Sequence, residues 1–341
     1  MIPISQTIVD KTIASFEPEI IAFTNLAKSK IEELKVKEKK LTVAEINYLN
    51  NLIGDLDDYK KLVTAQPSIL FNLQSKYPPF PKPNLVKRIV SKAIQVVTNQ
   101  PKEKTLSNKI ITALGYKTLR SDFYPKYFHK IGIKTCVYCN SQLTVTIELK
   151  QNVNSTLPKE IKARFQVDHH IPKADYPCFG ISLYNLYPTC GPCNLAKSDE
   201  PFDFELYTND ITLTQESKFK FRLKTGSVAK YLSSEKIDDL IITFQEPIKN
   251  GQSCPGKFQQ TFDIEGIYDT QRDLAEELIL KARHYNKIYK EELVGNFSSL
   301  FTNASLSNRI LVGNYTNPDD IHKRPMAKFT QDIARQLKLI K

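Results

Sequence analysis

Two pairs of cysteines are the residues of this sequence whose types and spacing most clearly predict chemistry. The sequence reads CVYC at 136–139 and CGPC at 190–193. The two intervening residues let both thiolates of a pair bind one ion, and two pairs complete a tetrahedral site. Because four sulfur ligands leave no open position, such a site does not activate water. The predicted ligands of a structural zinc ion are therefore Cys136, Cys139, Cys190 and Cys193.

Carboxylate, imidazole and amide side chains accompany the second cysteine pair. Asp168, His169 and His170 precede it in the stretch QVDHHIP, and the pair is flanked by Asn185 and Asn194. Carboxylate and amide oxygens are hard ligands that suit Mg²⁺, and imidazoles exchange protons near neutral pH. A closed zinc site needs none of these groups. Together they could hold Mg²⁺ and deprotonate a water, which is the equipment for hydrolysing a phosphodiester bond.

The motifs follow one another in a recognisable order: CVYC, VDHHIP, NLYPTC and CGPCNLAKSD. This order closely resembles that of HNH endonucleases, in the zinc-containing branch of the ββα-metal (His-Me finger) superfamily. The resemblance covers residues 135–200 and implies a ββα-metal core stapled by zinc. It also implies Mg²⁺ or another divalent cation as catalytic cofactor and DNA as partner.

The resemblance implies a role for each matching residue. His169 matches the general base that takes a proton from the attacking water, and Asp168 matches the metal-binding acid. Asn194 matches the second protein ligand to Mg²⁺, where some members have His. Asn185 matches the residue that braces the loop and orients the catalytic histidine. Lys197, one helical turn after Asn194, is either a contact to a substrate phosphate or one lysine among many.

The adjacent histidines leave an alternative open. In an ideal strand Asp168 and His170 share a face and His169 points away, which would place His170 beside the metal. A strand end or bulge at Pro172 would turn both histidines inward. Following the family pattern, we expect His169 to be the base and His170 to be a supporting or packing residue.

Positive charge is concentrated before the first cysteine pair. The net charge is +11, and residues 60–130 hold 14 Lys or Arg against only Glu103 and Asp122. A polyanion is one explanation, because basic surfaces attract phosphate backbones. A solvated, lysine-rich helical surface is the other, and both interpretations stay open.

The apolar pattern and the cysteines bear on the cellular compartment. The sequence has no run of about 18 apolar residues, which a membrane span needs, and its N-terminus lacks the signal-peptide pattern. We therefore expect a cytoplasmic protein with no membrane partner, where metal binding is favoured over disulfides. Cys178 and Cys254 stand outside the pairs and are expected to be small buried side chains.

Hydrophobic periodicity predicts an α+β fold with three regions. Residues 1–130 form a helical, basic region, because their apolar residues recur at helical spacing. Residues 131–205 form the nuclease core with its four-cysteine zinc site, and residues 206–341 form a mixed region of strands and helices. The flanking regions are expected to recognise DNA, bind a partner or hold the nuclease inactive.

Several individual elements are predicted from local patterns. Thr42 and Glu45 form a capping box that begins a helix. QLTVTIELK and IKARFQVDHH alternate as the two strands of a hairpin, which makes the gap between Cys139 and Asp168 long for the family. The remaining predictions are a helix at 83–100, strands at 218–226 and 240–245, a helix at 269–293 and a last helix after His322.

The sequence thus predicts a metal-dependent endonuclease that hydrolyses phosphodiester bonds of DNA. An RNA nuclease with the same chemistry is one alternative, and a non-catalytic zinc module that binds nucleic acid or protein is another. Two settings fit the resemblance: restriction, and prokaryotic antiviral defence against phage alongside a partner ATPase or sensor protein. The discriminating feature is the set Asp168, His169 and Asn194, which a binding module does not need.

Overall fold

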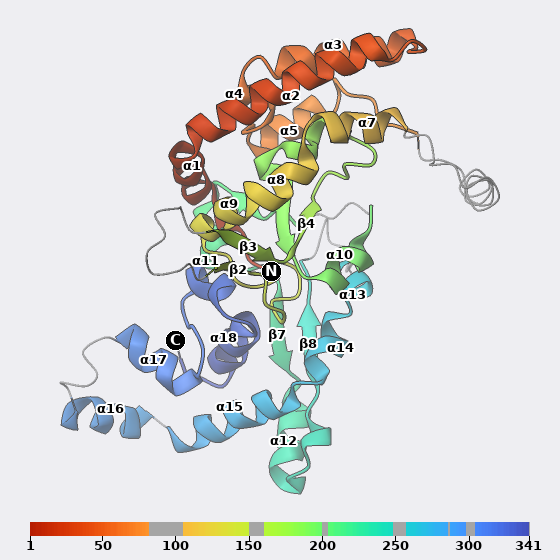
Figure 1. Cartoon of the computed structure of the whole chain (residues 1–341). Helices are drawn as coiled ribbons and strands as arrows, with labels where there is room; N and C mark the ends of the chain where they lie inside the picture. The colour runs from red at the N-terminus through yellow and green to blue at the C-terminus, as the bar shows by residue number, and fades with distance from the viewer. Residues whose placement is uncertain are drawn as a thin grey trace.

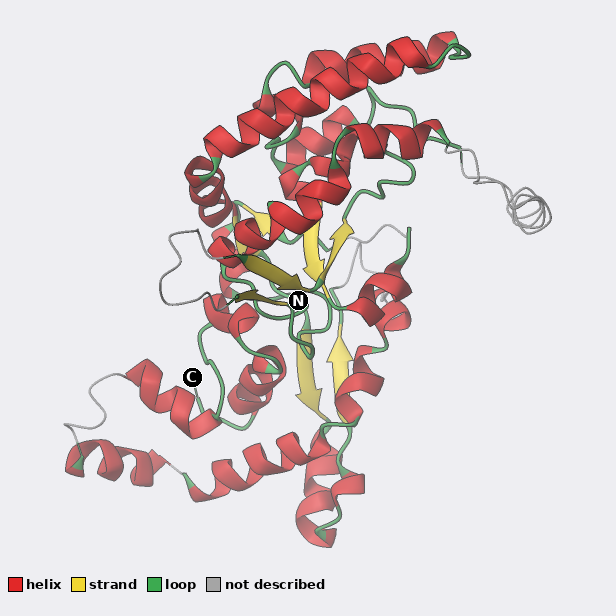
Figure 2. Cartoon of the chain, in the orientation of Figure 1, coloured by secondary structure: helices red, strands yellow, loops and turns green. Residues whose placement is uncertain are grey.

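The protein has a mixed α+β fold in which helices predominate. Its structure, a computed structural model, describes residues 1–81, 105–149, 160–199, 204–247, 257–285, 287–297 and 304–340. Within these ranges the strands pair into small sheets of two strands each. The sheets lie along the middle of the molecule with helices at both ends (Figure 2). The predicted α+β class is therefore confirmed, while the helix expected at 83–100 lies outside the described residues.

The N-terminal part of the chain is helical, as predicted, and forms the red and orange end of Figure 1. The long helix α2 (Glu17–Lys37) packs along α3 (Val43–Asp55). The predicted capping box begins α3: Thr42 Oγ1 accepts from the Glu45 N–H, and the Glu45 carboxylate accepts from the Thr42 N–H at 2.8 Å. The other helices here are α1 (Gln6–Ser15), α4 (Tyr59–Leu62), α5 (Pro67–Leu73), α7 (Leu106–Ala113), α8 (Tyr116–Asp122) and α9 (Tyr124–Ile131).

The first residues of the chain are built into the middle of the molecule. Met1 is fully buried, and its amino group donates a hydrogen bond to Val137 O at 2.7 Å. β1 (Ile4–Ser5) then pairs in parallel with β6 (Tyr207–Thr208). The N-terminus therefore connects residues 136–140, named the first cysteine loop, to the C-terminal half.

Four central strands form two antiparallel pairs. They are β2 (Val145–Glu148), β3 (Ile161–Arg164), β4 (Gln166–His169) and β5 (Leu186–Thr189). The β2–β3 pair confirms the predicted hairpin. Its second strand ends earlier than predicted, because the chain bends at Phe165, whose ring packs edge-on against Phe128. Beyond the bend, β4 pairs with β5 instead of with β2.

A β-β-α unit follows from this pairing. β5 leads through Cys190 into the short helix α10 (Gly191–Lys197), which packs against β4. The connection between the two strands contains two short 3-10 helices, η1 (Pro177–Ile181) and η2 (Leu183–Asn185). β4, β5 and α10, together with the connection between β4 and β5, form the β-β-α unit.

The C-terminal part combines one two-stranded sheet with several helices. β7 (Lys220–Leu223) and β8 (Ile242–Gln245) pair within their predicted ranges, and the predicted last helix, α18 (Ala327–Gln336), packs on β7. The helix predicted at 269–293 is wrong in extent, because non-helical backbone at Tyr285 separates two helices. The remaining elements are α11 (Ile211–Gln215), α12 (Thr225–Ser234), η3 (Ile237–Asp239), α13 (Lys257–Phe262), α14 (Ile264–Asp269), α15 (Arg272–His284), α16 (Lys287–Asn296), α17 (Ala304–Val312) and η4 (Pro318–Lys323).

One cluster of buried apolar side chains extends through these parts, from Met1 to Ile340. Aromatic rings fill much of it: Tyr138, in the first cysteine loop, stacks on Phe262 of α13 with ring centroids 4.7 Å apart. The cysteine-bearing segments are therefore packed against the C-terminal helices as well as against each other. None of the helices that the structure describes is long and apolar enough to cross a membrane.

Candidate metal centre and catalytic site

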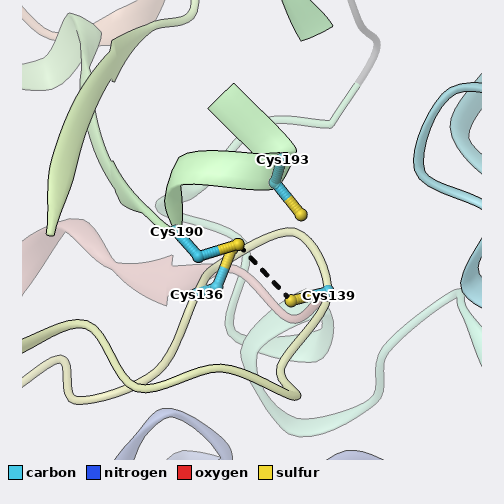
Figure 3. A group of neighbouring side chains, drawn as sticks. All are labelled: Cys136, Cys139, Cys190 and Cys193. Carbon is cyan, nitrogen blue, oxygen red and sulfur yellow. Dashed lines mark hydrogen bonds between the residues drawn. The ribbon is translucent and has the colours of Figure 1, made fainter. Parts of the chain in front are cut away.

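The four cysteines of the two CxxC pairs meet at one point (Figure 3). Their sulfur atoms all lie within 4.8 Å of one another, and Cys139 Sγ lies 4.0 Å from Cys190 Sγ. Sulfurs arranged tetrahedrally around zinc at about 2.3 Å lie about 3.8 Å apart. All four side chains are buried. The cysteine cluster is therefore close enough to hold one metal ion, as the spacing predicted, and its donor set fits zinc.

A tight turn presents each cysteine pair. In the first pair the Asn140 N–H donates to Cys136 O at 2.9 Å, and Asn140 takes the left-handed conformation with φ of 54°. Asparagine adopts this conformation more readily than most residues. In the second pair Cys190 is the N-cap of α10 and Cys193 lies in its first turn. Each pair thus aims both of its sulfurs at the same point.

The crowded thiols do not share one pKa. Hydrogen bonding with Cys136 lowers the pKa of Cys139, and the Ser141 hydroxyl donates a further hydrogen bond to Cys139 Sγ at 3.1 Å. Burial raises the pKa of Cys136. Because a metal binds thiolates, a cluster of this kind releases protons on binding and holds its ion more tightly as pH rises.

The β-β-α unit carries all four residues of the predicted catalytic set. Asp168 and His169 are the last two residues of β4, and Asn185 immediately precedes β5. Asn194 lies on α10, directly after the last cysteine. Residues from two strand ends and one helix therefore belong to one local structure, next to the cysteine cluster.

Asp168 is buried and already has two hydrogen-bonding partners. Tyr138 Oη donates to Asp168 Oδ2 at 2.6 Å, and Lys197 Nζ lies 3.1 Å from the same oxygen. Lys197 is fully buried and also donates to the carbonyl oxygen of His169 at 3.0 Å. In this structure Lys197 is therefore a partner of Asp168, and its contact with a substrate phosphate stays a prediction. Its ammonium group faces inward because it neutralises a buried carboxylate.

The ring of His169 has a defined tautomer. Nε2 lies 3.1 Å from the carbonyl oxygen of Gly180, which only accepts hydrogen bonds, so Nε2 carries the proton. Nδ1 is then the proton acceptor and lies 3.3 Å from Lys173 Nζ. Burial, followed by the charge of Lys173, lowers the pKa of His169 well below its usual value. The imidazole is neutral at neutral pH, as a general base must be.

Lys173 lies beside both Asp168 and His169. Its ammonium group sits over the ring of Tyr116, 5.4 Å from the centroid, and that ring lies 5.1 Å from the ring of His169. Burial lowers the pKa of Lys173, whereas the nearby charge of Asp168 raises it. Asp168, His169, Lys173 and Lys197 together form a group called the polar site below.

His170 has a different environment from His169. Its ring stacks on Tyr187 with centroids 5.3 Å apart, and it meets Phe71 edge-on at 5.8 Å. Its backbone N–H donates to Asn185 O at 2.9 Å. These ring contacts are those of a packing residue, whereas Nδ1 of His169 lies 3.3 Å from Lys173 Nζ.

Asn185 holds the loop that follows the two histidines. Its Oδ1 accepts from the Ile171 N–H at 2.7 Å, and its Nδ2 donates to the carbonyl oxygens of Ile171 at 3.0 Å and Phe179 at 3.1 Å. Gly180, which accepts the hydrogen bond from His169, is the next residue after Phe179. Asn185 therefore has the contacts expected of a brace that acts on His169 through the backbone.

Asn194 is fixed beside β4 at a point two residues before Asp168. Its Nδ2 donates to Gln166 Oε1 at 2.7 Å, and its side chain is half-buried. Gln166 and Asp168 are two residues apart in β4 and therefore lie on the same face of the strand. The structure therefore brings Asn194 to the face that carries Asp168, although the two side chains have different partners. Asn194 contacts Gln166, whereas Asp168 contacts Tyr138 and Lys197.

Several described lysines of the basic segment 60–130 are already paired with acids. Lys76 meets Asp55 at 2.6 Å and Lys109 meets Glu38 at 2.8 Å. Residues 82–104 lie outside the described residues. For these two lysines the pairing supports the interpretation that the positive charge belongs to a solvated helical surface. The polyanion partner stays a prediction.

Sequence reasoning missed two partners of the polar site. Tyr138 lies between the two cysteines of CVYC, so the zinc motif itself placed a phenol near the metal-binding segment. Lys173 lies four residues after His169, in the loop that Asn185 braces. The motifs gave neither residue a role, because both contacts depend on how β4 packs.

Comparisons with known proteins found no relative. A scan against protein-family models gave no match, and searches of curated proteins and of solved structures gave none either. The function is therefore inferred from the residues of this chain and their contacts.

Proposed function

We propose that the protein is a metal-dependent endonuclease of the HNH type, with the polar site of the β-β-α unit as its catalytic centre. The observation that carries the proposal is the orientation of His169. Its Nε2 donates to Gly180 O, so that Nδ1 is the basic nitrogen, and its neighbour in sequence is the buried carboxylate of Asp168. The order of the motifs and the adjoining cysteine cluster support the same proposal.

His169 is the proposed general base for the attacking water. A neutral imidazole with one nitrogen fixed as donor accepts a proton at the other, and such a base typically contributes about 10²- to 10⁴-fold to the rate. The positive charge that forms on the ring is then stabilised by the Gly180 carbonyl. Asn185 keeps this geometry by holding both Ile171 and Phe179.

A divalent cation such as Mg²⁺ is the proposed cofactor, with Asp168 and Asn194 as its protein ligands. Asp168 Oδ2 is engaged by Tyr138 and Lys197, whereas Oδ1 has a longer contact, 3.4 Å to Lys197 Nζ. Oδ1 and the amide oxygen of Asn194 therefore fit a hard cation best. When bound, the cation would neutralise charge on the phosphate and on the departing oxygen.

Lys173 is the proposed contact to the scissile phosphate. It is half-buried, lies beside His169 Nδ1 and feels the charge of Asp168. A lysine in this position acts as a point charge on a phosphate oxygen. In this proposal Lys173 takes the role that the sequence offered to Lys197.

Cleavage of supercoiled plasmid tests the proposal. Wild-type protein is expected to nick or cut the plasmid with Mg²⁺ and not with a chelator, and His169→Ala is expected to lose cleavage while it still binds DNA. His170→Ala is the matched control, because the neighbouring histidine packs on Tyr187, and we expect it to keep most of the activity. Equal cleavage by wild-type protein and His169→Ala would contradict the assignment. Single-stranded RNA in a parallel reaction tests the alternative substrate.

A non-catalytic zinc module is a second candidate, and the Asp168–Lys197 pair favours it. A carboxylate neutralised by a fully buried ammonium is an arrangement that also serves as support for a fold. In this case Asp168 and Tyr138 would only join the cysteine cluster to β4. The protein would then bind nucleic acid or a protein partner without cleaving any of the substrates.

A further inference from the structure

A cavity of about 310 Å³ lies outside the β-β-α unit, between the C-terminal helix α18, the start of β7 and the first residues of the chain. This volume is at the lower end of the range for small-molecule sites, which is about 300–1,000 Å³. Its apolar wall is formed by residues that include Ile2 and Ile321, both buried. The cavity is not used by the proposed nuclease chemistry.

The charged side chains of the cavity include one more cation than carboxylates. The cations are Lys220, Lys328 and Arg335, and the carboxylates are Glu216 and Asp332. Lys220 pairs with Glu216 at 2.7 Å, and Lys328 pairs with Asp332 four residues along the same helix. A cavity with an excess of positive charge favours an anionic ligand.

Arg335 is held at the cavity by neutral acceptors. Its guanidinium donates to Gln331 Oε1 at 3.3 Å and to the carbonyl oxygen of Thr316 at 3.1 Å. These contacts orient the group and leave its charge uncompensated by them. A guanidinium has five N–H donors, so an oxyanion can bind it in addition to these acceptors.

Lys328 forms a rigid, buried end of the cavity. The residue is only 2% exposed, and its backbone N–H donates to Asn140 Oδ1 at 2.9 Å, next to the first cysteine pair. Its partner Asp332 also accepts from the Phe221 N–H at 2.8 Å. Burial lowers the pKa of Lys328 to about 8, against the opposing effect of its partner Asp332, and the charges of Lys220 and Arg335 lower it further. An anion would offset the repulsion that Lys220 and Arg335 exert on Lys328.

Glu216 occupies the place that an anion would take. Its pKa is lowered first by the hydrogen bond with Lys220 and then by nearby cations that include Lys328 and Arg335. The side chain is 76% exposed, so it can turn into solvent without leaving a buried group unpaired. The cavity therefore presents three cations around one exchangeable carboxylate.

We propose that this cavity binds a phosphate group, free or carried by a small molecule, through Lys220, Lys328 and Arg335, with Glu216 displaced into solvent. A phosphate group matches three cations because it carries up to two charges and offers oxygens in several directions. An arginine fork fits two of these oxygens, and the lysines bind as point charges. The proposal is independent of nuclease activity.

Titration calorimetry of the full-length protein with inorganic phosphate, AMP and adenosine tests the proposal. We expect wild-type protein to bind phosphate, and Arg335→Gln to weaken this binding by about tenfold or more through the loss of a charged contact. Glu216→Gln should strengthen binding, because it removes the competing carboxylate. Lys224→Gln, which removes an exposed lysine just beyond β7, is the charge-matched control and should leave binding unchanged.

The outcomes separate the two sources of phosphate. Tighter binding of AMP than of phosphate, with adenosine much weaker, supports an organic phosphate as the ligand, whereas equal binding of AMP and phosphate supports the free anion. If Arg335→Gln does not fold, the gain with Glu216→Gln carries the test. The proposal is overturned if neither phosphate nor AMP binds at millimolar concentration, or if binding is the same in wild-type protein and Glu216→Gln.

Discussion

The cysteine cluster and the polar site are neighbours in the β-β-α unit, but they are built in opposite ways. In the cysteine cluster the four donor atoms are alike, lie within 4.8 Å of one another and are set by two local turns. In the polar site Asp168 is satisfied by groups of opposite kind, a phenol and an ammonium, which come from the first cysteine loop and from α10. The cysteine cluster suits a fixed metal ion, whereas in the polar site protein groups balance the charge of the carboxylate.

This difference teaches how the two sites depend on the fold. The cysteine cluster joins the first cysteine loop to α10, and the same two segments supply Tyr138 and Lys197 to Asp168. Zinc binding would therefore position the partners of the carboxylate without touching it. We expect damage to the cysteine cluster to disrupt the polar site, and damage to the polar site to leave zinc bound.

The largest expected effect comes from removing one cysteine ligand. A structural zinc site contributes on the order of 10 kcal/mol to folding, so Cys193→Ser should lose zinc and lower the free energy of unfolding by roughly half of this or more. Zinc content and urea denaturation measure the effect. Cys178→Ala, which also removes a buried thiol, is the control and should keep one zinc per chain. One zinc per chain in Cys193→Ser would show that Cys193 is not a zinc ligand.

Lys197→Met should have the next largest effect. It leaves the Asp168 carboxylate buried without its cation, which costs about 3–5 kcal/mol, and the double variant with Asp168→Asn should recover part of this loss. Urea denaturation of the two single variants and the double variant measures the coupling. Lys37→Met, which removes the exposed partner of Glu33, should leave stability unchanged. Zinc content should stay at one per chain in all of them, and its loss would show that the two sites are not separable.

Asn185→Ala should destabilise the loop after β4 by about 2–3 kcal/mol. The substitution removes three hydrogen bonds and leaves the buried backbone N–H and carbonyl of Ile171 unsatisfied, whereas the Phe179 carbonyl keeps the Ser182 N–H as a donor. Hydrogen exchange at the Ile171 amide should become faster, whereas exchange at the Asn140 amide in the first cysteine loop should be unchanged. Slow exchange at Ile171 in the variant would show that Asn185 is not the brace of this loop.

The smallest expected effect is the pH dependence of stability that His322 contributes. The carbonyl oxygen of His322 accepts a hydrogen bond from the Lys134 N–H, just before the first cysteine pair. Burial lowers the pKa of His322 from 6.5 to about 3. As pH falls, His322 therefore takes up a proton in the unfolded chain before it does so in the folded protein. The contribution of the neutral His322 to the free energy of unfolding is complete above about pH 6.5 and decreases progressively below it. The expected slope is about 1.4 kcal/mol per pH unit.

His322→Gln isolates this contribution. Gln keeps a donor for Ile2 O, which His322 Nε2 contacts at 2.8 Å, and it does not titrate. The free energy of unfolding, measured from pH 7 to pH 5, should fall less steeply in the variant than in wild-type protein. Identical slopes would mean that His322 does not stay neutral in the folded state.

Sequence reasoning predicted the cysteine cluster well because its information is local. The CxxC spacing places two sulfurs within one turn of the chain. The only step left to infer was that the two cysteine pairs lie next to each other in the fold. The same holds for the capping box of Thr42 and Glu45. The strand prediction failed at Phe165 because alternation continues through the bend, and only packing against Phe128 and pairing with β5 show where one strand ends.

The polar site was predicted in part. Asp168, His169, Asn185 and Asn194 do lie in one unit, but the inward turn of Lys197 was missed. A lysine on a short helix reads as exposed from sequence, and its burial follows from the position of Asp168 across the unit. The contacts of Tyr138 and Lys173 likewise join residues that have no fixed spacing.

Anomalous scattering from crystals grown with zinc and soaked in Mn²⁺, a substitute for Mg²⁺, is the most direct test of the account that one unit holds two unlike metal sites. The account predicts zinc between the four sulfurs of the cysteine cluster, and Mn²⁺ on Asp168 Oδ1 and the Asn194 amide oxygen with Lys197 still beside Oδ2. Zinc between the sulfurs with no Mn²⁺ at Asp168, even with DNA bound, would contradict the catalytic assignment and favour the non-catalytic module.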